Sequence, residues 1–126
     1  MTKNPTKTSI QSLIKELSEA MRLAKLDIQR AMYIQGTPGI SSAQYSAACD
    51  TIMESCLIVT TLGQLREMAR EVIDNAQPVT ADMFSNFMLN QLCNLERCNR
   101  NDGSLESRAK SRVYFLLKST YQKFYI

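Results

Sequence analysis

The four cysteines, Cys49, Cys56, Cys93 and Cys98, are the side chains of this sequence with the widest range of chemistry. A structural zinc site typically combines two Cys-x-x-Cys or His-x-x-x-His pairs. Here six residues separate the first two cysteines and four separate the last two, which matches that pattern poorly. Disulfides would require export, whereas thiols in a reducing cytosol pack as small hydrophobic side chains. We therefore expect buried thiols, and no metal or cofactor.

Acid–base and nucleophilic catalysis find little support in the sequence. It contains no histidine, which excludes a histidine base, a Ser-His or Cys-His pair and a histidine metal site. Its four glycines form no phosphate-binding loop. Acidic pairs such as Glu16–Glu19 and Glu67–Glu71 have the spacing of solvent-facing positions on a helix. These features predict a protein that is not an enzyme.

The C-terminal stretch, residues 111–126, holds five of the nine aromatic side chains, interleaved with basic residues. On a helical wheel most of these rings share the side of Leu116 and Leu117, which is typical of a helix docked on a core. Phe115 falls on the opposite side, among polar and basic positions. We predict that it anchors a partner. The basic residues expected around this anchor are Arg108, Arg112 and Lys118, with Arg97 and Arg100 extending the patch across the preceding loop.

Two kinds of partner suit this surface. An acidic protein surface would bury Phe115 inside a rim of arginines, whereas single-stranded nucleic acid would stack a base on the ring and place phosphates on the arginines. The net charge of +3 makes no case for nucleic acid by itself, although residues 97–126 hold seven basic and two acidic side chains. If the last helix is covered on both sides, Phe115 is simply part of the core.

Helices must position all of these residues, because no segment alternates as a strand does. The first helix is expected from about Ser9 to Ile34, with apolar residues at intervals of three and four, the spacing of a heptad stripe. This stripe packs inside a bundle or forms a seam with a second copy. The residues predicted for self-association, including two leucines beside the stripe, are Ile14, Leu17, Met21, Leu23, Ala24, Leu26 and Ile28.

The rest of the chain divides at turn and cap signals. Residues 35–42, "QGTPGISS", predict a turn, with Ser41 or Ser42 as the N-cap of the next helix. Between 42 and 76 the apolar face rotates near three weak helix formers, Thr60, Thr61 and Gly63. Two helices, 42–59 and 62–76, are expected there, with one long helix as the alternative. Further helices are expected from Thr80 to Asn99 and over 105–125, the latter capped by Ser104.

These patterns predict an all-α, single-domain bundle of four to five helices with a long amphipathic first helix. Residues 1–8 are expected to form a flexible tail and residues 9–126 the helical domain. No apolar run approaches the ~20 residues of a membrane span, and no secretory signal is present, so a cytoplasmic location is expected. The predicted function is non-catalytic protein binding, as a small adaptor, inhibitor, chaperone or regulatory subunit. Nucleic-acid binding and a self-associating structural subunit are the alternatives.

Overall fold

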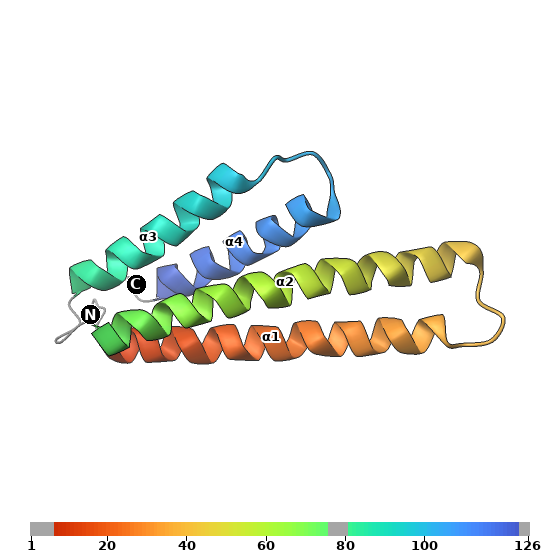
Figure 1. Cartoon of the computed structure of the whole chain (residues 1–126), viewed down its shortest axis with the longest axis horizontal. Coiled ribbons are helices and arrows are strands. Elements are labelled where there is room, and N and C mark those ends of the chain that lie inside the picture. The colour runs from red at the N-terminus through yellow and green to blue at the C-terminus, as the bar shows by residue number, and fades with distance from the viewer. Residues whose placement is uncertain (1–6, 76–80, 124–126) are drawn as a thin grey trace.

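The computed structural model describes residues 7–75 and 81–123. This part of the chain is built of four helices and contains no strand (Figure 1). Most of the predicted tail lies outside the described residues, although Lys7 and Thr8 belong to the first helix. The helices are α1 (Lys7–Gln35), α2 (Ser42–Asn75), α3 (Ala81–Cys98) and α4 (Leu105–Lys123).

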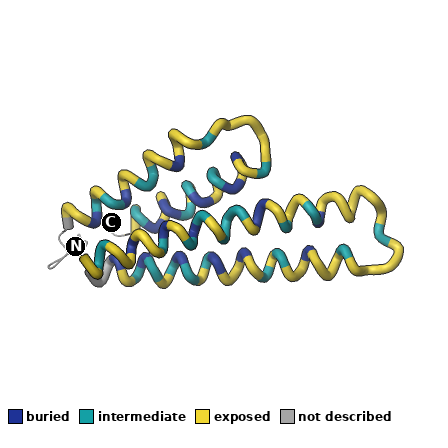
Figure 2. Tube along the Cα trace, viewed as in Figure 1, coloured by how far each residue is buried: buried dark blue, intermediate teal, exposed yellow. Residues whose placement is uncertain are grey.

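The helices form a long hairpin with a shorter pair of helices on one half of it. α1 and α2 run antiparallel along their length, and α3 and α4 lie over the end of the hairpin that carries the start of α1 (Figure 1). The side chains of Arg66 and Ser18 are hydrogen-bonded across the hairpin at 3.3 Å, and those of Gln35 and Cys49 at 3.0 Å. The other half of the hairpin extends past α3 and α4, and most of its residues are exposed (Figure 2).

The hydrophobic core lies where all four helices meet. Phe84 and Met88 of α3 are fully buried there. Within the described residues, the buried core cluster has no member between Met21 of α1 and Leu62 of α2. The covered half of the hairpin therefore holds the core. Its members are Ile10, Leu13, Leu17, Met21, Leu62, Leu65, Ala69, Phe84, Met88, Leu95, Val113 and Leu117.

The predicted break between residues 59 and 62 is wrong, because α2 is one continuous helix through this region. The hydroxyls of Thr60 and Thr61 donate hydrogen bonds to the carbonyls of Cys56 and Leu57, four residues back, and so remain inside the helix. Gly63 lies on the side that faces α1, where a Cβ would sit 3.5 Å from Met21 Cε. Packing against α1 thus outweighs the weak helix propensity of these residues. The fifth helix of the predicted count came from this break.

Two predicted helix caps are confirmed. The Ser41 hydroxyl accepts a hydrogen bond from the Gln44 backbone N–H at 3.1 Å, and the Gln44 side chain accepts one from the Ser41 N–H at 2.9 Å. This reciprocal pair is a capping box at the start of α2. Ser104 likewise accepts from the backbone N–H of Ser107 at the start of α4. The predicted start at Thr80 lies outside the described residues.

Candidate functional site

The uncovered half of the hairpin, residues 27–53, is called the arm below. α4 meets α2 near Glu54, whose carboxylate pairs with Arg108 at 3.0 Å. Ser42, the first residue of α2, lies twelve residues before Glu54, so the arm projects ~18 Å beyond this contact. Residues 31–53 contain one charged side chain, Asp50, although 21% of the whole chain is charged. An exposed surface with so few charges resembles the centre of a protein interface.

Large apolar side chains are exposed on the arm. Of the large hydrophobic residues that are exposed in the described part of the chain, half belong to it. They are Met32, Tyr33, Ile34, Tyr45 and Met53. Tyrosine and methionine are enriched in interfaces, where their large side chains adapt to a partner's surface.

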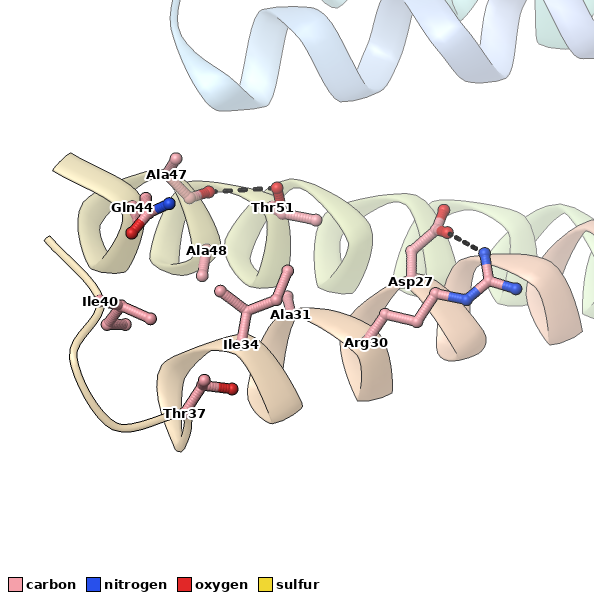
Figure 3. A pocket seen from close by; sticks show the side chains of 10 residues that line it. All are labelled: Asp27, Arg30, Ala31, Ile34, Thr37, Ile40, Gln44, Ala47, Ala48 and Thr51. Atoms are coloured by element: carbon pink, nitrogen blue, oxygen red, sulfur yellow. Dashed lines mark hydrogen bonds and ion pairs between the residues drawn. The ribbon is translucent and has the colours of Figure 1, made fainter.

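One side of the arm is hollowed into an apolar groove of about 560 Å³, called the distal groove (Figure 3). Buried Ala31 and Ala48 lie between its two walls, and the Ile34 side chain projects into it from α1. All the residues that line it come from α1, α2 and their connecting loop, and none from the described parts of α3 or α4. The lining is Asp27, Arg30, Ala31, Ile34, Thr37, Ile40, Gln44, Ala47, Ala48 and Thr51.

The distal groove continues the cleft that α4 occupies. On α2, Ala47, Thr51, Glu54 and Ile58 follow one another at intervals of four, three and four residues, which keeps them on one face of the helix. Glu54 contacts α4 through Arg108, and Ile58 lies beside α4 in a second depression. Asp27 of α1 lines both that depression and the distal groove. The same face of the hairpin is therefore covered by α4 along one half and open along the other.

The structure divides the basic surface predicted on α4. Arg108 and Arg112 approach the buried carboxylate of Glu54 at 3.0 and 3.6 Å, so their charges are partly neutralised within the chain. Lys118 Nζ lies 6.0 Å from the centre of the Tyr114 ring, a weak cation–π geometry. Phe115 is 64% exposed, so it is not part of the core.

Arg97 and Arg100 are exposed near the end of α3. A depression of about 220 Å³ lies beside Phe115, and neither arginine lines it. Arg100 instead lines a separate depression at the start of α4. The predicted patch is thus an exposed ring with basic residues around it, and its two central arginines already have a partner.

The residues predicted for self-association also differ in exposure. Leu17, Met21 and Ala24 are buried inside the chain, so a second copy reaches them only if the hairpin opens. Leu23 is 49% exposed, in the depression beside α4. The remaining three residues, Ile14, Leu26 and Ile28, are half-buried.

The expectation of buried thiols is wrong for three cysteines. Cys56, Cys93 and Cys98 are exposed and Cys49 is half-buried, and all four are free thiols. Within residues 7–75 and 81–123, no three Cys, Asp or Glu side chains converge as metal ligands would. No helix in these ranges is long and apolar enough to cross a membrane.

Within the described residues, the surface groups Glu19, Arg22 and Asp102 have shifted pKa values. A hydrogen bond from Arg22 lowers the pKa of Glu19, and the same bond raises the pKa of Arg22. Hydrogen bonds from Ser104 lower the pKa of Asp102 in the loop before α4. None of these groups lines the distal groove, whose alanine and isoleucine side chains offer apolar contact rather than acid–base chemistry.

Sequence reasoning missed the residues of the distal groove. Alanine and threonine carry no chemistry that marks a site, and the run with a single charge from 31 to 53 is the one signal that points to it. Comparison with protein-family models, with curated proteins and with solved structures finds no match.

Proposed function

We propose that this chain is a non-catalytic protein-binding module, and that it binds a helical segment of a protein in the distal groove. The observation that carries the proposal is the continuity of this groove with the cleft that α4 fills. A helix already packs on this face of the hairpin, and the same face continues, apolar and open, for ~18 Å. Proteins that bind amphipathic helices do so in open apolar grooves of this kind.

The side chains of the groove define the segment that fits. The exposed groove residues of α2, Ala47 and Thr51, are small, so the backbone of a bound helix can approach α2 closely, towards the short end of the 8–10 Å range of helix packing, beside the Ile34 side chain of α1. The bound face should carry uncharged apolar residues at intervals of three and four. Asp27 and Arg30, 4.0 Å apart at the edge of the groove, offer one charge of each sign for polar contacts.

A photo-crosslinking residue placed at Thr51 tests this proposal. Thr51 is exposed and lines the groove, so the probe occupies the site without disturbing the core. The matched control carries the same probe at Ser46, which is exposed on the same helix but does not line the groove. Irradiation in an extract of the cells in which this protein naturally occurs should give protein adducts from position 51 and none from position 46.

An adduct alone does not establish the site. The captured segment, made as a peptide, should also bind the purified chain and lose binding in Ala47→Glu, because a carboxylate in an apolar groove is left without a partner. Equal adducts from positions 51 and 46, or a peptide that binds Ala47→Glu normally, would overturn the proposal.

Nucleic-acid binding through α4 is the second candidate, and the exposed ring of Phe115 favours it. Because Arg108 and Arg112 pair with Glu54, reversing their charges would also disturb the fold. Arg97→Glu/Arg100→Glu and Phe115→Ser are cleaner variants. Binding to single-stranded DNA or RNA that weakens steeply with salt, and is lost in these variants, would move this function to first place. Absence of binding at low salt would remove it.

We also propose a cytoplasmic location, which the four free thiols support. Labelling of the cysteines in freshly lysed cells tests it, because thiols found oxidised in pairs would contradict it.

A further inference from the structure

We propose that the segment bound in the distal groove is the arm of a second copy of this chain. Two arms would pack face to face and antiparallel about a two-fold axis. This inference rests on the proposed function of the groove as a protein-binding site and names its occupant.

The two halves of the hairpin differ in the number of helix layers. Along one half of the hairpin, α1 and α2 form one layer and α3 and α4 a second, with the core between them (Figure 1). Along the arm the second layer is missing, although the apolar face continues. A pair of helices buries such a face only against another layer. The arm of a second copy is a two-helix layer of the same kind, and it would complete a four-helix bundle.

The length of the arm fits a closed pair of chains. In an antiparallel pair, the tip of each arm points toward the start of α4 in the other copy. Each arm projects ~18 Å beyond its own α4, so each has the length that the other leaves open. The contact uses the same surface on both copies, which closes the assembly at two chains.

The arm carries few charged side chains. Residues 31–53 carry only Asp50, which is exposed and does not line the groove. A strongly acidic or basic partner would find few charges to pair with on this surface, whereas a second arm, whose net charge is −1, meets little repulsion. The two charged residues at the edge of the groove, Asp27 and Arg30, have opposite signs. A two-fold arrangement therefore does not have to bring like charges together at this edge.

A whole arm offers a larger contact surface than a single helix does. A face two helices wide, each ~10 Å across, and ~18 Å long has a footprint of about 360 Å². For the two copies together this footprint is about 720 Å², at the low end of interface sizes, so we expect a dimer of modest affinity. A single bound helix covers about half as much and falls in the range of transient contacts. The area therefore favours a whole arm over one helix.

Sedimentation equilibrium of the purified full chain tests the proposal. The native chain should be a dimer at micromolar concentration. Ala47→Glu/Thr51→Glu should raise the dissociation constant by more than about tenfold, because four carboxylates then enter the seam of the dimer, and the lining offers one basic side chain per copy, Arg30, which already faces Asp27. Ser46→Glu adds the same charge outside the groove and should leave dimerisation unchanged. Circular dichroism and thermal unfolding of each variant check that the fold is intact.

Two outcomes would overturn the inference. The first is a chain that stays monomeric up to ~100 µM. The second is a dimer that survives Ala47→Glu/Thr51→Glu. If that dimer is lost in Met53→Lys, the contact lies on residues outside the groove. A monomer whose Thr51 probe still captures another protein would refute the second copy and leave the proposed function standing, whereas a monomer without adducts would refute both.

Discussion

Glu54 shows how one residue joins two helices of this chain. Its side chain is 7% exposed, and it receives Arg108 and Arg112 from α4. More than half of each arginine side chain is exposed, so water screens the pair and the arginines are easily solvated again. Glu54→Gln should therefore lower the free energy of unfolding by only ~1 kcal/mol, measured by urea denaturation.

Removing the arginines should cost more than removing the carboxylate. Arg108→Ala/Arg112→Ala leaves the Glu54 side chain buried without a counter-charge, and this situation costs ~3 kcal/mol. We therefore predict that the double arginine variant loses more free energy of unfolding than Glu54→Gln does. If Glu54→Gln proves more damaging than the double arginine variant, the carboxylate has a role beyond this pair.

Phe115 and Phe84 allow a matched comparison of an exposed and a buried ring. Phe115 contacts Tyr114 edge to face, with ring centres 5.6 Å apart, and is otherwise 64% exposed. Phe115→Ala should lower the free energy of unfolding by less than ~1 kcal/mol. Phe84 is fully buried, and Phe84→Ala should cost ~3–5 kcal/mol. Equal losses would show that Phe115 belongs to the core and is no anchor for a partner.

We expect Asp102 to contribute to the pH dependence of the free energy of unfolding in the acidic range. Its carboxylate accepts a hydrogen bond from the Ser104 N–H at 3.0 Å, and contacts with Ser104 lower its pKa from the ordinary value of 3.8. A folded-state pKa below the unfolded one contributes stability that is present above 3.8 and is lost as the pH falls through the folded-state pKa. In Asp102→Asn the free energy of unfolding should therefore fall less steeply as the pH is lowered through this acidic range. The urea midpoint, measured as a function of pH, checks this. An unchanged slope would contradict it.

At the scale of the helices, Gly63 offers a test of the continuity of α2. A Cβ at this position would be in ordinary contact with Met21 Cε at 3.5 Å, and the residue lies inside a helix. Gly63→Ala should raise the free energy of unfolding by ~0.5–1 kcal/mol, because glycine is a poor helix former. Gly39 is the control, since its φ of 82° disfavours any side chain and Gly39→Ala should destabilise the fold. A loss of stability in Gly63→Ala would show that the helix is strained there.

The sequence predicted those features of the helices that depend on near neighbours. The caps at Ser41 and Ser104 need only a hydroxyl and an N–H three residues on, so local rules found them. The continuity of α2 depends on α1, which packs against Gly63, and no local rule contains that contact. The pairing of Glu54 with Arg108 joins residues far apart in the sequence and was missed for the same reason.

At the scale of the whole molecule, the run of residues 31–53 with one charge is the sequence signal for the candidate site, and it does not show the groove itself. The distal groove exists because α4 meets the hairpin near Glu54 and leaves its far half open. That geometry depends on the packing of four helices together. The exposure of Phe115, by contrast, followed from its place on the wheel of a single helix, which a sequence contains.

The uneven distribution of the core predicts that the two halves of the molecule differ in stability. The core cluster has no member between Met21 and Leu62, so in the monomer the arm should open without disturbing the covered half. At low protein concentration, backbone amides of residues 28–50 should exchange with deuterium more than about tenfold faster than those of 10–21. Raising the concentration should slow exchange in the arm alone, because a second copy would cover it, and Ala47→Glu/Thr51→Glu should abolish this dependence. Equal protection of both halves at low concentration would mean that two helices suffice to hold the arm, and that the arm needs no second layer.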